Sequence, residues 1–180
     1  KPLFVTDGDN PARAFGMSAA DRANALALKA KLEPAPQAYA GRSTVYADLD
    51  WAWDPEWLVA MAETPGRVLA KNGHPVLAHV PAGGDPATVL TAMLSSGRYE
   101  GGALELVDAD TADFSYRKLR KRDRRFVMRL DPADAEPVER AAYDASYKGV
   151  TDILTLYLWR RAAFYLTRCA AQAGLTPNMV

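Results

Sequence analysis

Two carboxylates stand one residue apart in Asp48-Leu49-Asp50, directly after the run Thr44-Val-Tyr-Ala47. That run has the β-branched and aromatic character of a strand, so the carboxylates are expected at a strand end. Open α/β sheets bind ligands at the carboxyl ends of their strands, and Mg²⁺ takes oxygen ligands and bridges nucleotide phosphates. The sequence therefore predicts a metal site at Asp48 and Asp50. The alternative is that Asp48 caps a turn while Asp50 stays solvated.

Three tryptophans follow these carboxylates, at positions 51, 53 and 57. Their rings have the size and shape to stack on a nucleotide base, but at these spacings one or two of them are expected to pack under a helix that begins at Pro55. The two histidines, His74 and His79, have no Ser or Cys nucleophile placed to match them, so neither is assigned a catalytic role.

A basic run at 117–125 carries seven Lys and Arg side chains in nine positions. Such a run favours contact with anionic lipid head groups, at about 1 kcal/mol per residue near a membrane surface. The alternative is a solvated face. No nucleic-acid partner is expected, because no aromatic interleaving accompanies the run.

The composition is that of a globular chain with a core of its own. It has 180 residues, 49% of them hydrophobic, and its 22 basic and 22 acidic side chains cancel. One cysteine excludes an internal disulfide framework and a multi-cysteine zinc site, which suits a reducing compartment such as the cytoplasm. No stretch reaches the roughly 18 apolar residues that a membrane-spanning helix needs.

Strand and helix patterns alternate along the first 149 residues and predict a layered α/β domain with a mostly parallel sheet. Ser18 is expected to cap a helix, and each Asp-Pro pair is expected to open one, because aspartate caps helices and proline fits their first position. The expected strands are 3–5, 44–47, 67–70, 75–80, 103–107 and 125–129, and the Asp-Pro pairs are 54–55, 85–86 and 131–132.

Residues 150–180 form a second segment with the pattern of amphipathic helices, closed by Gly174 as a helix cap. Aromatic side chains such as Phe164 and Tyr165 alternate with arginines such as Arg168, which suits a helix lying in a membrane interface. Two alternatives are that the helix packs on the α/β domain, or on a second copy of itself. An exposed apolar face would also favour a homodimer.

Ser146-Tyr-Lys-Gly-Val-Thr-Asp152 and Gly174-Leu-Thr-Pro-Asn178 together resemble the junction before the membrane part of CDP-alcohol phosphatidyltransferases. The resemblance implies phospholipid biosynthesis at the cytoplasmic face of the inner membrane, with Mg²⁺-assisted transfer of a phosphatidyl group by residues after Val180. It also implies that this chain is a non-catalytic domain. The residues then expected near lipid head groups or the acceptor phosphate are Lys148, Asp152, Arg160 and Arg161.

Phe15-Gly-Met-Ser-Ala-Ala-Asp-Arg22 and Tyr46-Ala-Asp-Leu-Asp50 resemble segments of sugar-phosphate nucleotidyltransferases, which implies a Rossmann-like domain with Arg13 near nucleotide phosphates. Residues 6–13 depart from that pattern. Active enzymes have a glycine-rich loop here, whose backbone amides approach the phosphates closely, whereas this chain has one glycine and two acids. We therefore expect cytidylyl transfer to be lost. An active cytidylyltransferase that makes a CDP-alcohol, and a purely structural dimerisation module, are the alternatives.

Overall fold

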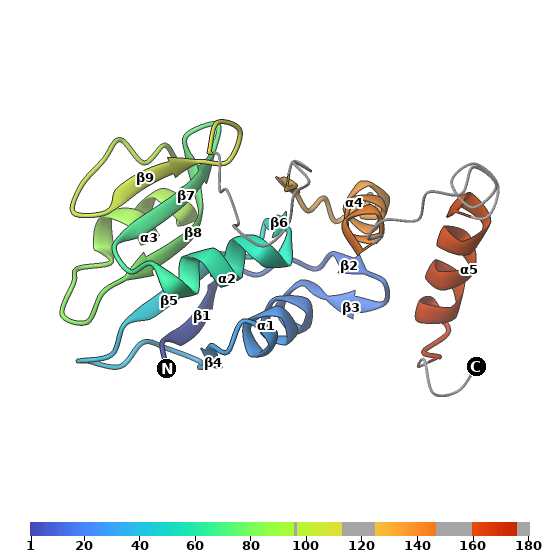
Figure 1. Cartoon of the computed structure of the whole chain (residues 1–180), viewed down its shortest axis with the longest axis horizontal. Coiled ribbons are helices and arrows are strands. Elements are labelled where there is room, and N and C mark those ends of the chain that lie inside the picture. Colours follow the sequence, from blue (N-terminus) through green and yellow to red (C-terminus); the bar gives the residue numbers. More distant parts are fainter. Residues whose placement is uncertain (96, 113–124, 147–159, 176–180) are drawn as a thin grey trace.

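The computed structural model describes residues 1–95, 97–112, 125–146 and 160–175. Its centre is a six-stranded mixed sheet, accompanied by two short antiparallel strand pairs and five helices (Figure 1). In spatial order the sheet contains β4 (Glu33–Pro34), β1 (Leu3–Asp7), β5 (Thr44–Asp48), β8 (His74–Val80), β7 (Arg67–Lys71) and β9 (Glu105–Asp108). The short pairs are β2 (Arg13–Ala14) with β3 (Met17–Ser18), and β6 (Trp51–Trp53) with β10 (Val127–Arg129). The helices are α1 (Ala19–Lys29), α2 (Pro55–Glu63), α3 (Ala87–Leu94), α4 (Glu136–Ser146) and α5 (Arg160–Gln172).

The predicted α/β class and the mostly parallel sheet are confirmed. The pairs β1–β4, β1–β5 and β7–β9 are parallel, and β8 runs antiparallel to both of its neighbours. The β7–β8 hairpin was not predicted. It turns at Asn72-Gly73, whose φ angles of 53° and 83° suit the type I′ turn that joins twisted antiparallel strands.

The sheet is covered on both faces, so side chains of either orientation are buried. Phe4, Val45 and Leu77 pack with α1 and α2 on one face. The next residue along each strand, namely Val5, Tyr46 and Ala78, packs with α3 on the opposite face. This arrangement leaves the sheet's carboxyl edge as the place where strand ends and loops meet.

Two of the expected helix starts are confirmed in detail. Ser18 caps α1 by accepting a hydrogen bond from the Asp21 amide, and Asp54 caps α2 by accepting one from Glu56, with Pro55 in the first turn. Each cap satisfies a backbone N–H that has no partner within the helix. At the other end of the chain Gly174, with φ 74°, closes α5 as expected, and Leu175 donates back to the Ala170 carbonyl.

The Asp85-Pro86 pair also stands at a helix start, which lies one residue later than expected, because Pro86 and not Asp85 is the N-cap of α3. Asp85 accepts from the Ala87 amide, and α3 begins there. The third pair was wrongly predicted, because Asp131 closes a local turn with the amide of Ala133. Asp134 then accepts from Glu136, where α4 begins, so a second aspartate takes over the capping role.

Helix α4 lies against β2, and α5, in red, stands beyond the β2–β3 pair, at the end of the molecule farthest from β9 (Figure 1). Among the described residues, no helix combines the length and apolar character needed to cross a membrane.

Candidate functional site

The carboxyl ends of β1 and β5 bring two aspartates together. Asp7 and Asp48 are register partners at the ends of these parallel neighbours. β4 lies on the other side of β1, so the chain order reverses between β1 and β5. Such a reversal is where open α/β sheets bind their ligands. Asp7 and Asp48 therefore mark the sheet's candidate site.

Asp48 is buried and uses both of its carboxylate oxygens. Its Oδ1 accepts from the Asp50 amide at 2.8 Å, and its Oδ2 lies 2.6 Å from His74 Nε2. The side chains of His74 and Asp48 are 12% and 9% exposed. The predicted strand end is confirmed, and so is the turn-capping role that was the alternative for Asp48.

His74 joins Asp48 to the loop after α3. Its Nδ1 lies 3.2 Å from the Gly97 carbonyl, and its ring stacks on Trp51 with centroids 5.4 Å apart. The two ring nitrogens of His74 thus connect the Gly97 carbonyl in the loop after α3 to the Asp48 carboxylate at the end of β5.

Asp7 carries the electrostatic cost of this arrangement. Burial raises the pKa of the Asp7 carboxyl, and the negative charge of Asp48 raises it further, while a hydrogen bond from Gly8 opposes both effects. A further negative charge beside Asp7 would be repelled, whereas a cation would relieve the repulsion.

The side chain of Asp50 bonds to the loop that follows β1. The buried Asn10 donates to Asp50 Oδ1 at 3.2 Å and to the Leu130 carbonyl at 3.0 Å, and it accepts from the Ala12 amide. Arg129 adds a long ion pair to Asp50 at 3.7 Å. The loop is therefore anchored by side-chain bonds rather than arranged around a row of glycines.

No group of three or more His, Cys, Asp or Glu side chains in the described parts of the chain is arranged to hold a metal ion. Mg²⁺ usually binds through one or two carboxylates, water and a substrate phosphate, so a preformed protein cage is not required. Magnesium at Asp48 and Asp50 stays a prediction.

Arg13, expected near nucleotide phosphates, lies on β2 and turns toward its own hairpin. Its guanidinium donates to the Gly16 carbonyl through Nε at 3.2 Å and Nη2 at 2.6 Å, at an exposed position. In the structure Arg13 contacts this turn rather than the carboxylates at the strand ends.

Sequence reasoning found part of this site. Trp53 and Trp57 are 1% and 2% exposed, which confirms that they pack in the core, whereas Trp51 lies beside His74. The roles of Asp7 and His74 were missed. The Asn72-Gly73 turn was an available signal, because it places His74 at the start of a strand that returns along the same edge.

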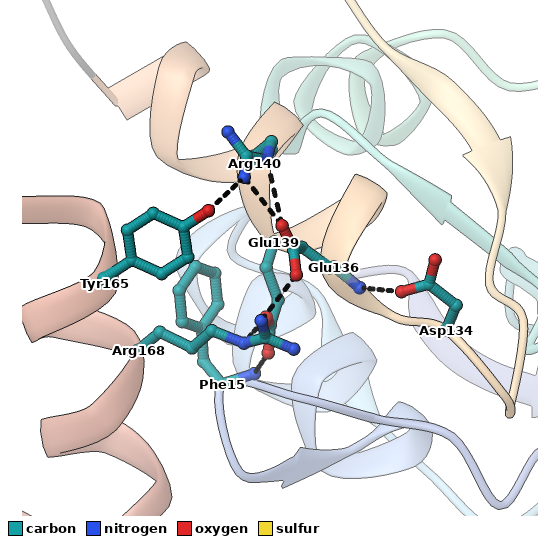
Figure 2. Close-up of polar contacts among 7 residues, drawn as sticks. All are labelled: Phe15, Asp134, Glu136, Glu139, Arg140, Tyr165 and Arg168. Carbon is teal, nitrogen blue, oxygen red and sulfur yellow. Dashed lines mark hydrogen bonds and ion pairs between the residues drawn. The ribbon is translucent and has the colours of Figure 1, made fainter. Parts of the chain in front are cut away.

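A second cluster attaches α5 to the domain (Figure 2). Arg168 of α5 lies 2.7 Å from Glu139 Oε2 and donates to Glu136 Oε2 at 2.7 Å. The Glu139 side chain is 2% exposed, and its other oxygen accepts from the Phe15 amide in the β2–β3 turn. One buried carboxylate thus joins α4, α5 and the first hairpin.

Apolar contacts strengthen this attachment. Phe164 is 3% exposed and meets Tyr143 edge to face, and Arg140 donates to the Tyr165 hydroxyl. A Cβ on Gly16 would lie 2.9 Å from the Ala171 carbonyl oxygen, so the hairpin turn touches the last turn of α5. This face of α5 packs on the domain, which was one of the alternatives for the tail.

The opposite side of α5 is open. Leu166 is 68% exposed, and Cys169 and Leu175 are exposed as well. Arg160 and Arg161 form the start of α5, but their side chains lie outside the described part, as do Lys148, Asp152 and the basic run except Arg125. The contacts predicted for these residues stay predictions.

No protein-family model and no curated protein matches this chain.

Proposed function

We propose that this chain is the domain that precedes the membrane part of a CDP-alcohol phosphatidyltransferase, at the cytoplasmic face of the inner membrane. The whole protein would transfer a phosphatidyl group from a CDP-lipid to an alcohol. The domain would position the membrane part without catalysing cytidylyl transfer itself, and its Rossmann-like fold would be a retained nucleotidyltransferase-like scaffold.

The observation that carries this proposal is the two-sided character of α5. One side is tied to the domain by Arg168 and the buried Glu139, and the other leaves Leu166 exposed. Large apolar side chains beside basic ones suit the interface of a membrane. A helix fixed in this way would transmit the position of the α/β domain to the segment that follows Thr176-Pro-Asn178.

The carboxyl edge of the sheet supports a non-catalytic domain. A triphosphate at Asp7 would meet a carboxylate whose pKa is already raised by burial and by Asp48. Asp48 has its oxygens engaged by His74 and the Asp50 amide. The loop after β1 is anchored by Asn10, and Arg13 is directed at Gly16.

The chemistry would then belong to the membrane part, where Mg²⁺ would stabilise the charge on the phosphates. Lys148, Asp152, Arg160 and Arg161 would contribute contacts to head groups or to an acceptor phosphate. The basic run at 117–125 would add attraction to anionic lipid.

Vesicle co-sedimentation tests the role of α5. Leu166→Glu places a charge on its open side, and Leu28→Glu is a matched control because Leu28 is 62% exposed on α1. We expect the chain and the L28E variant to sediment with vesicles rich in anionic lipid, and the L166E variant to sediment less. Equal sedimentation of both variants would contradict the proposal. If L166E instead converted a dimer to a monomer without changing sedimentation, the open side would be a homodimer contact.

An active cytidylyltransferase is a second candidate, favoured by the position of Asp48 and Asp7 at the reversal of strand order. It predicts release of pyrophosphate from CTP and a polyol phosphate, lost in Asp48→Ala and Asp50→Ala. We expect no release by the unaltered chain. Turnover that depends on either aspartate would replace our proposal by this one.

A further inference from the structure

A cavity of about 610 Å³ opens at the β7–β8 turn that directly precedes His74. Its lining comes from the β7–β8 turn, the loop after α3, and β9, namely from Asn72, Gly73, Arg98, Tyr99, Glu100, Leu106 and Asp108. His74 Nδ1 contacts the Gly97 carbonyl, which fixes the start of this loop against the hairpin. A cavity of this volume is large enough for a small ligand.

The glycine of the hairpin turn positions a guanidinium in this cavity. A Cβ on Gly73 would lie 2.8 Å from Arg98 Nε and 3.2 Å from Nη2. The guanidinium therefore occupies the space that a side chain at position 73 would need. Gly73 also has φ +83°, which L side chains rarely adopt. Within the described residues Arg98 forms no hydrogen bond or ion pair, which leaves its donors available to a ligand.

Two carboxylates face the same cavity. Asp108 uses Oδ1 to accept from the amides of Asp110 and Thr111, which leaves Oδ2 for a further partner. Glu100, in the described part of the chain, is joined to no other residue by a hydrogen bond or ion pair. The walls are completed by the buried Tyr99 and by Leu106, which is 47% exposed.

This combination selects the charge pattern of a ligand. A polyphosphate would satisfy Arg98 but would be repelled by Glu100 and Asp108. A simple cation would satisfy the carboxylates and leave the guanidinium without a partner. A molecule that carries an anionic group and an ammonium, joined by a short apolar link, satisfies both.

We propose that this cavity binds a small zwitterion, with its carboxylate or phosphate on Arg98 and its ammonium on Glu100 and Asp108. An amino acid and a phosphorylated amino alcohol share this chemistry. The site is separate from the α5 cluster, so its ligand can be tested whether or not the chain belongs to a membrane transferase.

Isothermal titration of the 180-residue chain with serine and with phosphoethanolamine tests the proposal and distinguishes these two sources. Glycerol 3-phosphate and ethanolamine are the controls, since each carries one of the two charges. We expect saturable binding of at least one zwitterion below about 10 mM and binding at least tenfold weaker for the single-charge controls.

Three variants connect binding to the cavity. Arg98→Gln should weaken zwitterion binding by about tenfold or more, because a charge-assisted hydrogen bond is lost, and Glu100→Gln should weaken it as well. Arg42→Gln, at an exposed arginine paired with Glu33, should bind as the unaltered chain does. Circular dichroism confirms that each variant is folded. Absence of binding, equal binding of glycerol 3-phosphate, or unchanged binding by R98Q would overturn the proposal.

Discussion

Arg168 of α5 and Glu139 of α4 form an ion pair of 2.7 Å in which the carboxylate is 2% exposed. Residues 147–159 separate the two helices in the chain, so the pair fixes the second segment to the α/β domain. Glu139 also holds the Phe15 amide, which extends the connection to the first hairpin (Figure 2).

Removing Arg168 should destabilise the protein strongly. Arg168→Met leaves the Glu139 carboxylate buried without its cation, and we expect a loss of about 3 kcal/mol in the free energy of unfolding, measured by urea denaturation. Arg140→Met is the control, since Arg140 pairs with Glu136 at a more exposed position and should lose clearly less. Equal losses in the two variants would show that the buried pair has no special role.

Gly16→Ala should detach α5. The new Cβ would lie 2.9 Å from the Ala171 carbonyl oxygen, and Gly16 has φ +76°. Gly41→Ala is a matched control, because Gly41 has φ +78° and no atom within 4 Å of its Cβ position. Both variants should lose about 1 kcal/mol to backbone strain. Only G16A should speed amide hydrogen exchange across 162–175, and protection there equal to that of G41A would refute the contact.

Much of the fold follows from local sequence signals. Strand 44–48 and the caps Ser18 and Asp54 were predictable because each depends on neighbours within a few residues. The helix start predicted at Asp131 was wrong because a second capping aspartate, Asp134, stands three residues later. Sequence alone does not show which of the two the helix uses.

The site was less predictable because it depends on strand order. Asp48 was identified from its strand, but its neighbour Asp7 and its partner His74 come from β1 and β8, which only the sheet brings together. The attachment of α5 has the same cause, since the Glu139–Arg168 pair and the contact with Gly16 join three distant segments.

Asp7→Asn should stabilise the protein at neutral pH. The pKa of Asp7 is raised in the folded protein. Its stabilising contribution is therefore fully present at pH values below the usual pKa of 3.8, and it is lost as the pH rises through the folded-state pKa. The variant should therefore melt at a higher temperature than the unaltered chain at neutral pH, and this advantage should disappear well below pH 3.8. Asp9→Asn, at an exposed acid nearby, should show no such difference. A lower melting temperature for D7N at neutral pH would contradict this account.

His79 should make the fold sensitive to mild acid. It is fully buried, its Nδ1 bonds the Met61 carbonyl, and burial lowers its pKa, against the effect of that bond. The unfolded chain takes up a proton near the usual value of 6.5 while the folded protein does not, so stability falls as pH drops below 6.5. Urea denaturation at successive pH values measures this slope. In His79→Gln, which can still donate to Met61, the slope between pH 6.5 and the lowered folded value should be shallower. An identical slope would assign the acid sensitivity to other groups.

The most direct test of the central proposal is made on the native gene product in its source cells, by determining its apparent mass and whether it fractionates with membranes. We expect a membrane-bound protein clearly larger than the 19.6 kDa of this chain, released by detergent and not by high salt. A soluble product of 19.6 kDa would contradict the assignment to a membrane transferase and leave ligand binding at the sheet edge as the function to pursue.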